Sequence, residues 1–104
     1  MRVLFHPESP KDVRKFQAEY TAISTGLGVR FRRELDDAVD AIKALPASAG
    51  HFLNIRSKVV RELRRRNLRA FPFFVLYGVT DDRLILGAVI PSRSDPLTWL
   101  TRFK

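Results

Sequence analysis

The pattern of hydrophobic and polar positions divides the chain into two helical segments and four strand-like ones. Arg2 to His6 alternates in hydropathy, which indicates a short opening strand. Ser9 and Pro10 then predict the start of a helix, because serine can cap free amide groups and proline is tolerated at the first helical position. The apolar residues that follow recur every three or four positions, as on the core-facing side of one helix. They are Val13, Phe16, Tyr20 and Ile23.

A second helical period predicts a longer helix after the glycine-containing segment from Ser24 to Gly28. Most of its charged residues fall on the outer side. There Arg33 and Asp37, and also Arg32 and Asp36, stand four positions apart and can form weak ion pairs. Pro46 ends the period, and the short link between the two helices predicts an antiparallel hairpin. The apolar positions of this second helix are Leu27, Phe31, Leu35, Ala38, Ile42 and Leu45.

Three strand candidates follow the helices, at about Arg64–Phe71, Phe73–Val79 and Arg83–Ile90. Residues Ala47 to Leu63 have no clean period, and we expect a loop or a short irregular segment there. The link from Thr80 to Asp82 is short enough for a hairpin. The order β-α-α-β-β-β predicts an α+β fold, in which a small, twisted, mainly antiparallel sheet carries the helical hairpin on one face.

Length and composition limit the possible classes of protein. A chain of 104 residues fits one domain spanning 1–104 with a modest core. The longest apolar run, Phe71 to Tyr77, is far below the roughly 18 residues needed to cross a bilayer, and no secretory signal pattern opens the chain. We therefore expect a cytoplasmic protein that does not enter a membrane. There is no cysteine and the two histidines stand far apart, so we expect neither a metal nor another cofactor.

The positive charge is concentrated in one part of the chain. The formal net charge is +8, and the segment from Arg56 to Arg69 holds seven cations against Glu62 alone. By contrast, the segment from Arg30 to Lys43 has four cations and four acids. A basic cluster of this kind suits a nucleic acid or an acidic protein partner, and it is also compatible with a solvated face that binds nothing specific.

Alternation along the arginine-bearing strand predicts which side chains are exposed. Leu68 and Ala70 favour burial on one face, so Arg65, Asn67 and Arg69 are expected on the exposed face. Arg64 and Arg66 then lie at the sheet margin. Guanidinium groups on a rigid strand can bind phosphates or carboxylates through paired hydrogen bonds. With cations near the last strand and the terminus, the candidate basic surface comprises Arg61, Arg64, Arg65, Arg69, Arg93 and Arg102.

The aromatic residues fit a core better than a base-stacking platform. The segment that holds Phe71, Phe73, Phe74 and Tyr77 is densely apolar, which favours packing over recognition of bases. Trp99 can seal the core or stack on a partner group.

Candidate catalytic residues are scarce. Metal-independent RNA cleavage needs an acid and a base beside the charge-stabilising cations. We interpret His6 and His51 as ordinary surface histidines, although His51 lies in the unassigned 47–63 segment. No residue is assigned as catalytic, and an enzymatic activity is not the leading expectation.

Several short motifs occur in an informative order along the chain. They are Arg64-Arg65, Leu68-Arg69-Ala70-Phe71-Pro72-Phe73, Leu76-Tyr77, Ala88-Val89, and Arg93-Ser94-Asp95-Pro96 followed by Trp99. In this order the chain resembles the RelE/ParE toxin superfamily. The resemblance implies the toxin of a type II toxin–antitoxin module, of the kind linked to growth inhibition and plasmid stabilization. It also implies a cognate acidic antitoxin as partner, with operator DNA bound only through that antitoxin.

The resemblance is stronger to the ParE branch, whose members are associated with poisoning DNA gyrase. The ribosome-dependent, mRNA-cleaving RelE branch commonly places His or Tyr at the exit of the last strand, where this chain has Pro91 and Ser92. Two alternatives stay open: an mRNA endoribonuclease of the RelE type, and an inactive, protein-binding member of the fold.

Overall fold

A computed structural model describes residues 2–53, 62–80 and 82–94, and its elements follow the expected order with one added strand. The helices are α1 (Ser9–Ile23) and α2 (Thr25–Ala44). The strands are β1 (Arg2–Phe5), β2 (His51–Leu53), β3 (Glu62–Asn67), β4 (Phe73–Val79) and β5 (Arg83–Pro91).

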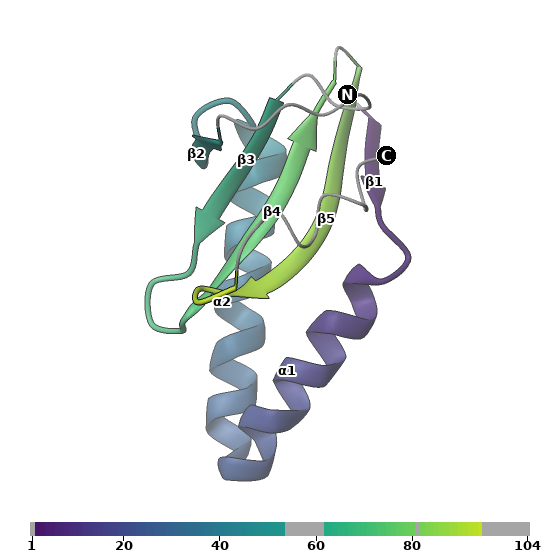
Figure 1. The fold of residues 1–104 in the computed structure, drawn as a ribbon. Helices are drawn as coiled ribbons and strands as arrows, with labels where there is room; N and C mark the ends of the chain where they lie inside the picture. The colour runs from purple at the N-terminus through teal and green to yellow at the C-terminus, as the bar shows by residue number, and fades with distance from the viewer. Residues whose placement is uncertain (1, 54–61, 81, 95–104) are drawn as a thin grey trace.

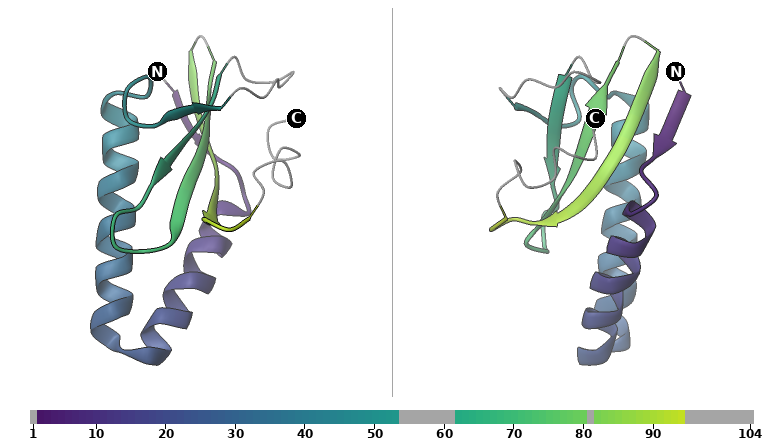
Figure 2. Two further views of the ribbon diagram at one scale, coloured as in Figure 1. Left: turned by 60° about the vertical axis from the view of Figure 1, so that its left-hand side comes forward. Right: turned by 45° about the vertical axis from the view of Figure 1, so that its right-hand side comes forward.

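The strands form one sheet in the order β1-β5-β4-β3-β2 (Figure 1). Only β1 and β5 pair in parallel, and the other neighbours are antiparallel. The predicted α+β fold with a mainly antiparallel sheet is therefore confirmed. The two helices form a hairpin on one face of this sheet, and the turn that joins them projects beyond its end (Figure 2).

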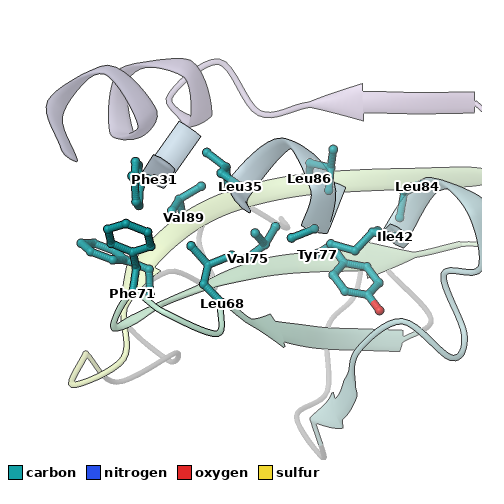
Figure 3. Packing of buried hydrophobic residues seen from close by; sticks show 12 residues of the cluster. Phe31, Leu35, Ile42, Leu68, Phe71, Val75, Tyr77, Leu84, Leu86 and Val89 are labelled. Carbon is teal, nitrogen blue, oxygen red and sulfur yellow. The ribbon is translucent and has the colours of Figure 1, made fainter. Parts of the chain in front are cut away.

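The main core lies between α2 and the sheet (Figure 3). Alternate residues of β4 point toward the helices, which places Phe73, Val75 and Tyr77 in this core. Phe31 on α2 is fully buried, and its ring centroid lies 5.4 Å from those of Phe71 and Phe73. The aromatic residues interpreted as core are thus buried. The other large contributors are Leu35, Ala38, Ile42, Leu68, Leu84, Leu86 and Val89.

A bulge in β5 fixes the start of α1. Leu76 and Tyr77 pair with Ala88 and Leu86, so Gly87 is the extra residue of β5. The hydroxyl of Ser9 is buried and points at the Leu86 and Gly87 carbonyl oxygens, at 3.0 and 2.9 Å. The predicted capping role of Ser9 was therefore wrong. Its hydroxyl donates to carbonyl oxygens of the bulge, and this contact ties the first turn of α1 to the sheet.

The boundaries in the second half differ from the prediction. The segment 47–63 contains β2 and the start of β3, and β3 ends at Asn67 instead of continuing to Phe71. The strand ends early because the amide groups of Arg69 and Ala70 donate to Glu34 on α2 rather than to a neighbouring strand. Ala70, expected in the core, is consequently exposed.

Two apolar residues of the helical periods also lie outside the core. Ile23 is 72% exposed because it ends α1 at the projecting turn of the hairpin, beyond the sheet. Leu45 follows the last residue of α2 and is 65% exposed. Of the two ion pairs predicted on the outer side of α2, Arg32–Asp36 is confirmed, with Nε 3.0 Å from Oδ1. The described residues show no ion pair between Arg33 and Asp37.

Candidate functional site

Arg65 is the best-positioned cation of the predicted basic surface. It lies on the sheet face opposite the helices, with its guanidinium carbon 3.9 Å from the centre of the Phe74 ring. Its Nε and Nη2 donate to Asn67 Oδ1 at 3.1 and 2.9 Å. Phe74 is fully buried, so the ring is a fixed platform. The guanidinium is thus held in one orientation, and its remaining N–H groups, which make no hydrogen bond to the described residues, can donate to an anion.

Arg69 and Arg93 extend the basic surface at one end of the sheet. Arg69 lies in the loop between β3 and β4, and Arg93 lies in the turn after β5. A hydrogen bond of 2.8 Å from the Ser92 amide to the Pro72 carbonyl joins that turn to that loop. Both arginines are exposed, and neither side chain makes an ion pair within residues 2–53, 62–80 and 82–94. The structure therefore brings Arg69 and Arg93 to the same end of the sheet.

Arg64 and Arg66 bind backbone carbonyls of the protein itself instead of facing outward. Arg64 Nη1 donates to the Gly50 carbonyl at 3.0 Å and its Nε to Glu62 at 3.0 Å, with only 15% of the side chain exposed. Arg66 Nη1 donates to the Ala49 carbonyl at 2.6 Å. These two guanidinium groups hold the loop between α2 and β2. The prediction that Arg64 lies at the sheet margin was wrong, because its backbone pairs with Phe52 of β2 on one side and with Tyr77 of β4 on the other. The predicted basic surface thus separates into loop-holding and outward-facing arginines.

Tyr77 completes the attachment of the same loop. Its hydroxyl donates to the Pro46 carbonyl at 2.7 Å. Burial raises the pKa of Tyr77, with a further increase from Glu62, while Arg64 and Arg66 act in the opposite direction. Tyr77 is therefore a neutral hydrogen-bond donor at physiological pH, and we assign it a structural role.

The Tyr77→Phe variant is expected to lose about 1–2 kcal/mol of stability at neutral pH, because it leaves the Pro46 carbonyl without this donor. The pKa of Tyr77 is raised in the folded state, so the contribution of its hydroxyl to stability is fully present below the unfolded-state pKa of about 10. This contribution is lost as the pH rises through the folded-state pKa. The variant lacks this part of the alkaline decline. Urea unfolding at neutral pH and at pH ~11 measures both effects.

Tyr20→Phe is the control for this prediction. The Tyr20 hydroxyl makes no hydrogen bond to the described part of the chain, so its removal should leave neutral-pH stability close to that of the wild type. Equal neutral-pH stability of Tyr77→Phe and wild type, with equally steep alkaline decline, would contradict the role given to Tyr77.

Other predicted site residues are placed only in part. Arg61, Trp99 and Arg102 lie outside the described residues. His51 begins β2, where its backbone pairs with that of Arg65. His6 Nδ1 accepts the Glu8 amide proton at 3.1 Å, just before α1, so this histidine has a local structural contact. Among the described residues there is no group of three or more His, Asp or Glu that fits a metal ion.

Two features of the site were missed by sequence reasoning. Asn67 was predicted on the exposed face, but its hydrogen bonds with Arg65 were not predicted. Residues two apart on a strand share a face, so this contact could have been found. Glu34 was missed altogether, because its contact with Arg69 and Ala70 spans 35 and 36 positions and leaves no local pattern.

The fold can now be compared with known proteins. It matches a chain from the chromosomal ParDE toxin–antitoxin system of P. aeruginosa with a TM-score of 0.69 and 13% sequence identity. The match covers 88% of this chain and 95% of that one. No protein-family model matches the chain, and no curated protein matches its sequence. The comparison shows a RelE/ParE-like fold for this protein. No described helix is long and apolar enough to cross a membrane.

Proposed function

We propose that this protein is the toxin of a type II toxin–antitoxin module, and that the outward-facing arginines form its functional surface. The observation that carries the proposal is the oriented guanidinium of Arg65, stacked on Phe74 and held by Asn67. Holding a long cationic side chain in place lowers the entropy lost when it binds an anion. The match to a chain of a ParDE system supports the assignment to such a module.

The proposed target is DNA gyrase, so that the toxin would stop replication. Support comes from the resemblance to the ParE branch and from the local contact of His6 with Glu8, so that no acid–base pair is assigned beside the basic surface among the described residues. One observation favours mRNA cleavage as a second candidate: the backbone of His51 pairs with that of Arg65 in the β2–β3 ladder.

A groove on the helical side offers a place for the proposed antitoxin. It has a volume of about 710 Å³ and lies between α1 and α2 above β5. Phe5, Leu35 and Leu86 give it an apolar lining, and Phe5 is 52% exposed. Charged residues also line the groove, including Arg14, Asp40 and Lys43. We propose that an amphipathic antitoxin segment covers this groove, while its acidic residues neutralise the basic surface.

Induction of the protein alone in bacterial cells tests the function. We expect growth arrest, with DNA synthesis falling first and mRNA staying intact in pulse-labelling experiments. Early loss of protein synthesis with cleaved mRNA would replace the gyrase assignment by the nuclease. Unchanged growth despite accumulation of folded protein would overturn the toxin assignment in favour of a purely protein-binding role.

A further inference from the structure

Glu34 occupies an anion-binding position formed by the main chain of the β3–β4 loop. Its Oε1 accepts the amide protons of both Arg69 and Ala70, the second at 2.9 Å. Two successive amides that converge on one oxygen form a binding site for a negatively charged group. The side chain that fills the site comes from α2, from the opposite layer of the molecule. The site and its occupant are thus formed by different elements.

Arginines surround this position on both sides. One hollow, of about 470 Å³, is lined by Glu34 together with Arg66 and Arg69. A second, of about 210 Å³, is lined by Glu34 together with Arg30 and Arg33. Asp37 lines both hollows and is the other acid beside the site. Four arginines against two acids leave a positive balance around the two amides, and that balance increases when Glu34 moves away.

We propose that the Arg69 and Ala70 amides, with the surrounding arginines, bind a carboxylate of an acidic peptide segment, and that Glu34 is the internal group that this carboxylate displaces. The structure itself shows that a carboxylate fits the two amides. Asp37 disfavours a more highly charged phosphate at the same place. The identity of the partner as an antitoxin rests on the proposed function, whereas the site and its chemistry do not.

An internal competitor weakens binding by a predictable amount. A tethered side chain has an effective concentration of millimolar or more, so an incoming carboxylate must compete against it. Removing Glu34 removes that competition. Glu34 therefore acts as a restraint on binding: it keeps the loop ordered while the site is empty and yields to a segment that brings several carboxylates at once.

Titration of the full chain with a hexaglutamate peptide, followed through the NMR signals of the Arg69 and Ala70 amides, tests the inference. Glu34→Ala is expected to bind the peptide about tenfold more tightly than the wild type, because the tethered competitor is gone. The largest signal changes should occur at these two amides. Glu34→Gln keeps an oxygen acceptor for the loop but loses the charge, so an intermediate gain is expected, and this variant also tests the site if Glu34→Ala unfolds.

Asp36→Ala is the matched control, because it removes the same charge from the same helix at a residue that pairs with Arg32 instead of the loop. Its peptide affinity should stay close to that of the wild type. Equal gains in Asp36→Ala and Glu34→Ala would show a general charge effect and overturn the proposal. The proposal would also be overturned if the peptide saturated either Glu34 variant without changing the NMR signals of the Arg69 and Ala70 amides. Growth arrest is a separate readout, so failure here is distinguishable from failure of the toxin assignment.

Discussion

The Phe31→Ala variant is expected to lose about 3–5 kcal/mol of its free energy of unfolding. Phe31 has no solvent exposure, and its ring lies 5.2 Å from Tyr20 on α1 and 5.4 Å from Phe71 and Phe73. Truncation removes this aromatic packing and leaves a cavity where α1, α2 and the β3–β4 loop meet. A single domain commonly has only ~5–15 kcal/mol in total, so the variant should be close to unfolding.

Denaturant unfolding followed by circular dichroism measures this loss. Val29→Ala is the matched control, since Val29 lies on the same helix but is 50% exposed. The control should change stability by less than about 0.5 kcal/mol. A Phe31→Ala midpoint close to that of the control would contradict the central position of Phe31 in the core.

Helices and strands that form because they bury a regular pattern of apolar side chains were predictable from the sequence. The repeat that includes Phe31, Leu35 and Ile42 requires a helix with one buried side, and the structure buries all three. The strand from Phe73 to Val79 was predicted with its observed bounds, because its apolar run contacts core on both faces of the sheet. In these segments local pattern and tertiary packing favour the same structure.

Features set by hydrogen bonds between residues far apart in the sequence were not predictable. The end of β3 depends on Glu34, and the role of Ser9 depends on the Gly87 bulge, 78 positions away. The loop before β2 is fixed by side chains of β3 and β4, so its own residues show no period. Each of these contacts joins distant parts of the chain, and neither residue of the pair reveals the other.

The sequence predicted which arginines belong to the candidate site, but not which of them bind other parts of the protein and which face outward. Alternation correctly put Arg65 and Asn67 on one face, but Arg64 lies between β2 and β4 instead of at the sheet margin. It gave no means of seeing that Phe74 holds Arg65 while backbone carbonyls engage Arg64. Whether a surface arginine is free or engaged depends on acceptors from other elements, which strand alternation does not report.

The Arg65→Ala/Arg69→Ala double variant is expected to abolish the proposed growth arrest and to weaken binding of the proposed antitoxin about 100-fold or more. Each side chain is proposed to make a charge-assisted contact, and such contacts are worth about 1.5–3 kcal/mol each. Folding should be nearly unaffected: the Arg65 contact with Phe74 is worth about 0.5–1 kcal/mol, and the Arg69→Ala substitution keeps the main-chain amide that donates to Glu34. Growth after induction and calorimetric titration with the proposed antitoxin measure the two losses.

A second double variant separates these positions from total charge. Arg2 and Arg83 are exposed and stand opposite each other in the β1–β5 ladder, at the sheet edge remote from β3. Arg2→Ala/Arg83→Ala removes the same two charges, and it should retain growth arrest and antitoxin affinity. If both double variants lose activity equally, the loss comes from the lower net charge and not from the two positions. Binding through net charge weakens as the salt concentration rises, whichever arginines provide it. If the Arg65/Arg69 variant keeps full arrest and full affinity, the oriented guanidinium on Phe74 is not the functional surface.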